Sequence, residues 1–487
     1  MIGLDSVFAR ARESRRFQIS LIIGVLIICS IISAIVATSG VTGGALVVLV
    51  VVAPLAIFSV VNYPKFGVMF FLIVAYVLMF FYSMGLIAFP LGTIMDGLLA
   101  LLLIGFFINQ KTSPNWEIFN NSITWMICVW LGYNLLEVVN PAAESKLAWL
   151  FTIRSLALLM MSYFVFMYNM NSVSIIRLFI KVWLGLSLFA ALYALKQEYI
   201  GFFQFELNNI NNPLSSSLLF IDGRWRKFSI FADPVAFAYN MNVSTILCIC
   251  LTFGPFSRKR KIQLIVMACL FYFTMLFSGT RAAYVLLPVA MAMVIILNLN
   301  LKMLIIGIVF VFSFLVMVFI PTSNYTIYRF QTAFRPSEDA SYTVRAQNQK
   351  IIQPYIRSHP MGGGLGASGA SGVRFSPGSF LAAFPPDSGF VRAAVEQGWI
   401  GLTLLCALFF TIVKTGINNF FRIRDPELKS YCLAMTAIVF ALCVGNFPQE
   451  GLIQFPLNVY FCVFAAIVNL TWIIDQRLNP LTKKLNS

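Results

Sequence analysis

Residues 430–447 read SYCLAMTAIVFALCVGNF, a run of eighteen residues without one charged side chain. A helix of roughly 20 predominantly apolar residues spans the hydrocarbon core of a bilayer. Further apolar runs of similar length lie outward from this stretch, near 17–38, 44–62, 66–88, 91–108, 122–139, 147–168, 174–196, 229–253, 262–279, 282–299, 302–320, 388–414 and 455–474. The sequence therefore predicts an all-α, polytopic integral membrane bundle of about 12–14 transmembrane helices.

The composition excludes several classes of protein. Of the 487 residues, 60% are hydrophobic and only 11% are charged, whereas soluble domains have about 45–50% apolar and about 25% charged residues. A soluble enzyme, a disordered protein and a nucleic-acid binder of the usual kind are all excluded. The formal net charge of +16 is attributed to orientation in the membrane, because cytoplasmic loops collect Lys and Arg. We expect no nucleic-acid partner.

The distribution of basic residues predicts how the chain is oriented. If the N-terminus is cytoplasmic and the helices alternate, the cytoplasmic side receives the basic residues of 1–16, 258–261, 414–429 and 477–484. The short outer loops 38–43, 87–92, 138–146 and 447–455 contain one basic residue, Lys146. This asymmetry predicts that both termini lie in the cytoplasm.

Two long polar stretches divide the chain. The predicted division is 1–196, N-terminal transmembrane helices; 197–228, an outer loop; 229–320, central transmembrane helices; 321–386, a large, partly helical outer loop; and 387–487, C-terminal transmembrane helices with a cytoplasmic tail. Long loops do not obey the charge rule, so basic residues in the two outer loops need a separate explanation.

The outer loops are rich in arginine. Segment 321–386 carries six basic and two acidic residues, and segment 197–228 ends in Arg224-Trp-Arg226-Lys. Arg281 is expected at a tight outer turn between two spans. Guanidinium groups bind phosphate and carboxylate bidentately, which points to an anionic ligand at the outer face. Loop solvation with structural ion pairs explains the charge equally well.

Ionisable side chains inside the predicted spans lie toward the outer side. They are Asp96, Glu137, Arg154, Asp233, Arg281, Asp387, Arg392 and Glu396, with Lys181 near an inner end as the main exception. Charges within a bilayer are costly and mark function. A one-sided group indicates a site that opens outward rather than an ion path. On one continuous helix, Asp387 and Glu396 would point in nearly opposite directions, about 13 Å apart along the axis, which argues against a glycosidase-type carboxylate pair.

Metal and nucleotide sites are not expected. The nine cysteines all fall in apolar runs, and His359 is the only histidine. His359 fits a general base near neutral pH, or a turn residue before Pro360. The glycine-rich stretch 361–366 lacks the Gly-Lys-Ser/Thr of a phosphate loop.

Four stretches, in order over residues 220–410, resemble the bacterial O-antigen polymerase and ligase family. They are Arg226-Lys-Phe-Ser-Ile-Phe-Ala-Asp233-Pro; Ser278-Gly-Thr-Arg281-Ala-Ala; Arg345 followed by Ile356-Arg-Ser-His359-Pro-Met-Gly-Gly-Gly-Leu-Gly366; and Asp387-Ser-Gly-Phe followed by Glu396-Gln-Gly-Trp-Ile-Gly401. The N-terminal half contributes only its hydropathy to the resemblance.

The resemblance implies a metal-independent, inverting glycosyltransferase of GT-C-like type without cofactors. It would act at the periplasmic face of the bacterial inner membrane on undecaprenyl-diphosphate-linked oligosaccharide. The outer loops would then be periplasmic, and the growing glycan chain, membrane lipids and a chain-length regulator would be partners. Arginines would neutralise the leaving diphosphate, a role that metals have elsewhere.

The resemblance also assigns roles to residues. Arg226, Arg281 and Arg345 are expected at the diphosphate, with Arg224 in support. Asp387 is the candidate base or acceptor-orienting group, with Glu396 behind it. Arg154, chosen as a charged residue within a predicted span, and His359, from the third stretch, are further candidate substrate-binding residues. A helix N-cap before Ser388 is an alternative, compatible role for Asp387.

The same stretch distinguishes the branches of the family. The ligase branch places a histidine where this chain has Pro386-Asp387-Ser388. This departure favours a repeat-unit polymerase for O-antigen, capsule or exopolysaccharide. Two alternatives stay open: a ligase that transfers glycan to lipid A-core, and a transporter of polysaccharide or lipid-linked glycan, which would need charges along a central path.

Overall fold

The computed structural model describes residues 57–85, 91–210, 216, 218–221, 223–323, 325–334 and 340–480, together with positions 30 and 33. It divides into two compact units after Tyr63. The predicted span near 17–38 and most of the span near 44–62 lie outside the described residues. The description below concerns the unit that begins at Pro64.

Every predicted span within the described part of this unit is helical. The helices are α2 (Pro64–Ser83), α3 (Leu91–Thr112), α4 (Ser122–Leu136), α5 (Lys146–Asn169), α6 (Val173–Tyr199), α9 (Pro234–Leu251), α10 (Arg258–Leu276), α11 (Leu286–Leu297), α12 (Leu301–Phe319), α16 (Gly389–Arg422), α17 (Pro426–Gly445) and α18 (Leu457–Leu478). Ten of the described helices are long and apolar enough to cross a membrane. The prediction of an all-α polytopic membrane protein is confirmed.

The connecting segments contain short elements. These are the 3₁₀ turns η1 (Trp116–Phe119), η2 (Glu137–Val139) and η3 (Arg281–Val285), the helices α7 (Gln204–Ile210), α13 (Tyr325–Thr332), α14 (Ala340–Ser358) and α15 (Gly369–Phe375), and the strands β1 (Phe220–Ile221) and β2 (Arg224–Trp225). The two strands form an antiparallel hairpin in which Phe220 pairs with Trp225.

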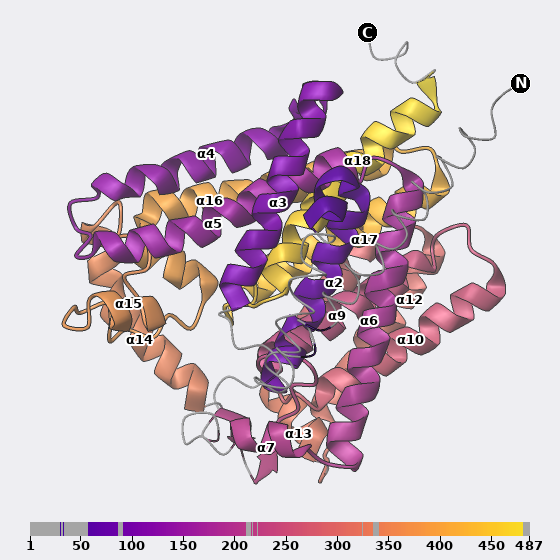
Figure 1. Cartoon of the computed structure of the whole chain (residues 1–487). Coiled ribbons are helices and arrows are strands. Elements are labelled where there is room, and N and C mark those ends of the chain that lie inside the picture. Colours follow the sequence, from indigo (N-terminus) through magenta and orange to yellow (C-terminus); the bar gives the residue numbers. More distant parts are fainter. Residues whose placement is uncertain are drawn as a thin grey trace, which may run out of the picture. The chain divides into compact units, whose positions relative to one another are not determined.

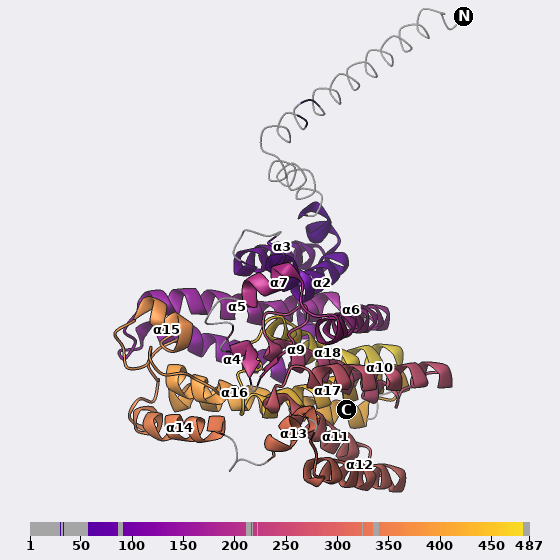
Figure 2. The same ribbon diagram turned by 90° about the horizontal axis from the view of Figure 1, so that it is seen from below.

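Three helices form the core of the bundle. In the most apolar 18-residue window of each helix, the buried share of residues is 89% in α9, 83% in α18 and 78% in α17, but only 17% in α12. Figure 1 shows these three helices between a group formed by α4, α5 and α16 and another that contains α6, α10 and α12. In the view turned by 90°, α14 and α15 lie beside the first group (Figure 2). The outer helices therefore present apolar side chains to lipid, and the core helices do not.

Helix α16 is interrupted where the sequence predicted one continuous span. Gly398 has φ 67° and ψ −174° inside the helix, a conformation open to glycine. A Cβ atom there would lie 1.9 Å from the carbonyl oxygen of Pro360. The break lets the glycine-rich segment 360–366 pack against the helix, where Gly363 N donates to Val395 O and Gly364 N donates to Glu396 O.

The start of α16 corrects another expectation. The N-cap position is Ser388, which makes no side-chain capping bond, so the N-cap role considered for Asp387 is wrong. Asp387 precedes the helix, which begins at Gly389. The argument that Asp387 and Glu396 point in opposite directions assumed one continuous helix through both residues, and it does not apply.

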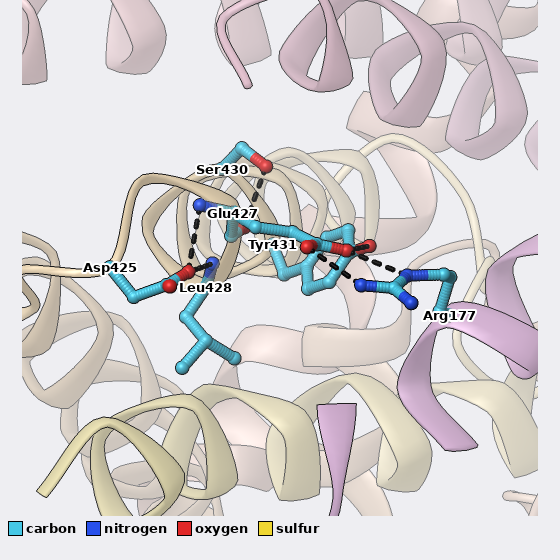
Figure 3. Close-up of polar contacts among 6 residues, drawn as sticks. All are labelled: Arg177, Asp425, Glu427, Leu428, Ser430 and Tyr431. Atoms are coloured by element: carbon cyan, nitrogen blue, oxygen red, sulfur yellow. Dashed lines mark hydrogen bonds and ion pairs between the residues drawn. The ribbon is translucent and has the colours of Figure 1, made fainter. Parts of the chain in front are cut away.

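Helix α6 connects two differently built ends of the bundle. At its start, Arg177 forms a bidentate pair with Glu427, at 2.9 and 2.8 Å, and Tyr431 donates to the same carboxylate (Figure 3). Near its other end, the Gln197 side-chain amide donates to Ser229 O and accepts from Ser229 N. The twenty residues between Arg177 and Gln197 correspond to about 30 Å of helix.

Candidate active site at one end of the bundle

The turn that joins α10 to η3 is the centre of the candidate site. Gly279 adopts φ 58°, Thr280 N donates to Ser278 Oγ, and Thr280 Oγ1 donates to Pro234 O at the start of α9. These bonds fix the turn against α9. They leave the carbonyl oxygens of Ser278 and Gly279 available to the loops around them.

Arg226 binds this turn from the first predicted outer loop. Its Nε donates to Ser278 O at 2.8 Å, and its Nη2 donates to Thr280 Oγ1 at 2.9 Å. A third, longer bond of 3.3 Å joins Nη1 to Leu218 O. All three acceptors are neutral, and no carboxylate among the described residues forms an ion pair with Arg226.

Arg329 reaches the same turn from α13, in the second predicted outer loop. Its Nε donates to Gly279 O at 3.0 Å, and the residue is only 8% exposed. Burial lowers the pKa of Arg226 to about 10, and the positive charges of Arg329 and Arg281 act in the same direction. We call Arg224, Arg226, Arg281 and Arg329 the arginine cluster.

A small cavity of about 40 Å³ lies within the arginine cluster. Its lining includes Arg224, Arg226, Arg329, Glu198 and Tyr284. Groups from α6, the β hairpin, η3 and α13 therefore converge on one point. Such convergence of guanidinium groups suits an anion, because fixed donors bind it with little reorganisation.

Arg345 and Asp387 meet at a separate position. Both line a cavity of about 20 Å³ between α14 and the start of α16. Arg345 Nη1 donates to Pro448 O at 2.9 Å, and Nη2 approaches Gln449 Oε1 at 3.5 Å. Within the described residues, the Asp387 carboxylate makes no hydrogen bond or ion pair.

Glu450 brings a further carboxylate to this position. It lies in the loop 446–456, which connects α17 to α18, and its Oε1 accepts from Arg392 Nε at 2.7 Å. Burial raises the pKa of Glu450 to about 7; the Arg392 charge opposes this shift, and the charges of Glu396 and Asp387 add to it. Glu450 can therefore exchange a proton near neutral pH.

Helix α9 runs from the arginine cluster toward the loop that carries Glu450. At its N-terminus, Asp233 accepts from Val235 N and Ala236 N, and its charge acts on Arg226. Six residues further on, Tyr239 donates to Gly445 O at 2.7 Å, just before loop 446–456. The rise between Asp233 and Tyr239 is about 9 Å.

The Glu396 carboxylate accepts two hydrogen bonds that position a neighbouring segment. Its Oε1 accepts from Ser368 Oγ at 2.6 Å, and its Oε2 accepts from Gly366 N at 3.0 Å. The residue is 4% exposed. Because both oxygens are already occupied, the carboxylate holds segment 364–368 against α16.

Two of the predicted residues lie elsewhere. Arg154 pairs with Asp96 at 3.2 Å, between α5 and α3. The His359 ring stacks on Tyr355 at 4.0 Å, and its Nδ1 lies 3.0 Å from the carbonyl oxygen of the same tyrosine. The structure brings Arg224, Arg226 and Arg281 together, and separately Arg345 and Asp387. Arg154 and His359 line none of the cavities described above.

Two site residues were missed by the sequence reasoning. Arg329 was counted among the charges of the large loop but was not selected, because nothing in the sequence indicates that it reaches the turn of Gly279. Glu450 is the lone acidic residue in a short outer loop, which is the one signal that could have drawn attention to it.

The candidate site is built from arginines and carboxylates rather than from metal ligands. Within the described residues, no group of three or more His, Cys, Asp or Glu side chains is placed to hold a metal ion. The groups that converge at the site are guanidinium and carboxylate groups. Metal-independent transfer stays a prediction.

Part of the chain matches a known protein family. A family model described as O-antigen ligase matches residues 264–406, less than a third of the chain. The matched segment includes Arg281, Arg329, Arg345, Asp387 and Glu396. Among the curated proteins, none matches this chain. The match supports a multi-pass membrane protein with a glycan-processing function of the polymerase or ligase type, and it does not distinguish these two branches.

Proposed function

We propose that the chain is a polysaccharide repeat-unit polymerase, and the match of residues 264–406 to a family model described as O-antigen ligase supports this proposal. It transfers glycan from an undecaprenyl-diphosphate carrier to a sugar hydroxyl of another lipid-linked unit, for O-antigen, capsule or exopolysaccharide. The reaction takes place at the periplasmic face of the bacterial inner membrane, with both termini in the cytoplasm. The observation that carries the proposal is the convergence of Arg226 and Arg329 on the turn of Gly279.

The arginine cluster would bind the donor diphosphate. A guanidinium group has five N–H donors, and Arg226 uses three of them in the bonds described, so two remain for phosphate oxygens. The bonds to the turn fix the orientation of the group before substrate arrives. Preorganised donors of this kind stabilise charge that develops in the transition state.

The chemical step is a single displacement at the anomeric carbon. The acceptor hydroxyl oxygen forms a bond to this carbon as the bond to the diphosphate oxygen breaks, and the electron pair leaves with the diphosphate. The hydroxyl proton passes to a base, for which Asp387 is the candidate. Its carboxylate makes no bond with other described residues, which suits a group that must accept a proton.

Helix α9 supports this division of roles. Asp233 beside the arginine cluster and Tyr239 beside Gly445 are offset by about 9 Å along the helix axis, and a sugar between a bound diphosphate and Asp387 would link the two positions. Arg345 holds loop 446–456 through Pro448 and would contact the diphosphate or the sugar from the opposite side.

The ligase alternative has one observation in its favour, the description of the matching family model. The sequence Pro386-Asp387-Ser388 favours the polymerase, because it lacks the histidine of the ligase branch. Deletion of the gene separates the two functions. Loss of a polymerase leaves single repeat units, whereas loss of a ligase leaves lipid-linked polymer that is not attached to lipid A-core.

Alanine substitution tests the proposal in cells. We expect Arg226→Ala, Arg281→Ala and Arg345→Ala each to shorten the polymer seen on a gel. Arg374→Ala is the matched control, because Arg374 lies over the Phe151 and Phe375 rings, in the same large loop but away from the cluster. Long chains in all three stably expressed variants would overturn the diphosphate role. Purified protein in liposomes with lipid-linked repeat units separates polymerisation from transport.

A further inference from the structure

Two adjoining cavities lie on either side of the contact between α5 and α18. The first, of about 290 Å³, is lined mainly by residues of α4, α5, α16 and α18. The second, of about 310 Å³, is lined mainly by residues of α2, α3, α5 and α18. Ser155, Leu159 and Asn458 line both, so the cavities meet at these residues.

The walls of both cavities are predominantly apolar. Leu156, Leu408 and Phe409 contribute to the first, and Phe71 and Met95 contribute to the second. Each volume is near the lower limit of ordinary small-molecule pockets. A long, flexible apolar chain is the ligand class that fits two such cavities in series.

Both cavities extend inward from one end of the bundle. The residues of α5 that line the cavities lie between 152 and 160, and those of α3 lie between 91 and 99. The residues of α18 that line them begin at Asn458. All three helices begin at the end of the bundle that holds Asp387 and Glu450. These three linings therefore lie within about 20 Å of that end, whereas the α16 lining of the first cavity extends further along its helix, to Phe409.

A cationic group lies at the end of the first cavity. Arg392 lines this cavity and is bound to Glu450, in the loop that also receives Arg345. The cavity of the arginine cluster shares no lining residue with either apolar cavity. Of these two positively charged positions, the arginine cluster and Arg392, only Arg392 adjoins an apolar cavity.

We propose that the adjoining cavities bind the isoprenoid chain of the acceptor, a second polyprenyl-diphosphate-linked saccharide, with its diphosphate at Arg392. This inference rests on the proposed polymerase function, in which the arginine cluster holds the donor. Surrounding lipid tails are as apolar as the ligand, so binding depends on van der Waals packing and on the headgroup rather than on the hydrophobic effect. A single methyl-branched chain with a doubly charged head meets both conditions. The acceptor hydroxyl would then approach the donor from the side of Asp387.

Photolabelling tests this site without requiring transfer. A photoactivatable polyprenyl diphosphate is added to the full chain in nanodiscs, and labelled peptides are mapped by mass spectrometry. We expect labels within 152–160 of α5 and 452–461 near the start of α18. Unlabelled undecaprenyl diphosphate should compete at least tenfold better than phosphatidylglycerol. Equal competition by the phospholipid would identify bulk lipid as the occupant and overturn the proposal.

A matched pair of variants tests whether the photolabel binds in these cavities. Ser155→Phe places a ring where the cavities meet and should reduce labelling at least fivefold. Leu150→Phe adds a ring on the exposed face of the same helix, 53% exposed and outside both linings, and should not change it. Equal labelling of both variants, each folded by size-exclusion chromatography, would refute the site.

The Arg226→Ala variant separates this inference from the proposed function. If the acceptor site is distinct from the donor site, labelling of α5 persists when Arg226 is removed and polymerisation is lost. Loss of α5 labelling in Arg226→Ala would show a single carrier site and overturn the inference alone. Normal α5 labelling in a protein that never elongates glycan would count against the polymerase and not against the cavities.

Discussion

Arg177 and Arg226 lie near opposite ends of α6 and use the guanidinium group differently. Arg177 places two N–H groups on the Glu427 carboxylate, which also accepts from Tyr431. Arg226 places its bonds on two backbone carbonyl groups and a hydroxyl group. The bidentate pair with Glu427 neutralises Arg177 and occupies its fork, whereas the neutral acceptors of Arg226 orient that group and leave its charge available. The first arrangement joins α6 to α17, and the second suits an anionic ligand.

The largest expected effect tests the charge of Arg226. Arg226→Ala should lower the polymerisation rate by about 10²–10³-fold, as loss of one preorganised donor to a developing anion does. Arg226→Lys should restore little of this loss, because an ammonium group cannot reproduce the planar fork. Chain growth in liposomes measures both rates. A lysine variant with nearly full activity would show that charge alone is sufficient.

The second-largest effect, a loss of stability, is expected at the break in α16. Gly398→Ala should destabilise the protein by about 3 kcal/mol, because the new Cβ would overlap the Pro360 carbonyl group and the backbone has φ 67°. The matched control is Gly378→Ala, whose Cβ would meet no atom within 4 Å. Thermal unfolding in detergent measures both variants. Equal melting temperatures would contradict the packing described for segment 360–366.

Glu450 predicts that stability depends on pH near neutrality. Its pKa in the folded protein, about 7, is raised above the ordinary value of about 4.3. The neutral form therefore contributes stability that is complete below about pH 4 and is lost as the pH rises through 7. Between pH 6 and 8 the melting temperature should fall, by the equivalent of about 1 kcal/mol, and Glu450→Gln should remove this dependence. An unchanged slope in the variant would exclude Glu450 as its source.

The smallest effect is expected at the other end. The Arg177 side chain is 47% exposed, and exposed ion pairs contribute about 0–1 kcal/mol. Arg177→Ala should lower stability by no more than this and leave the polymerisation rate within about twofold of wild type. A double-mutant cycle with Glu427→Gln measures the coupling energy. A rate loss as large as that of Arg226→Ala would contradict the contrast between the two ends.

Hydropathy predicted the spans because a bilayer demands long apolar helices, and all predicted runs within the described part of the unit after Tyr63 are helical. The break at Gly398 was not predicted, because it depends on how Pro360 packs against the helix. Likewise, Arg226 and Arg329 reach one turn from loops a hundred residues apart. Composition predicted that arginines would gather on one side, but only tertiary contacts decide which of them meet.

The order in which the chain is made adds a consequence of this arrangement. Translation delivers Arg226 and the turn of Gly279 long before Arg329, and the loop of Glu450 emerges only with the last two helices. A ribosome-bound chain that ends before residue 446 thus lacks part of the site, however many spans it has already inserted. The candidate site of a nascent chain would therefore be incomplete until the hairpin of α17 and α18 enters the membrane.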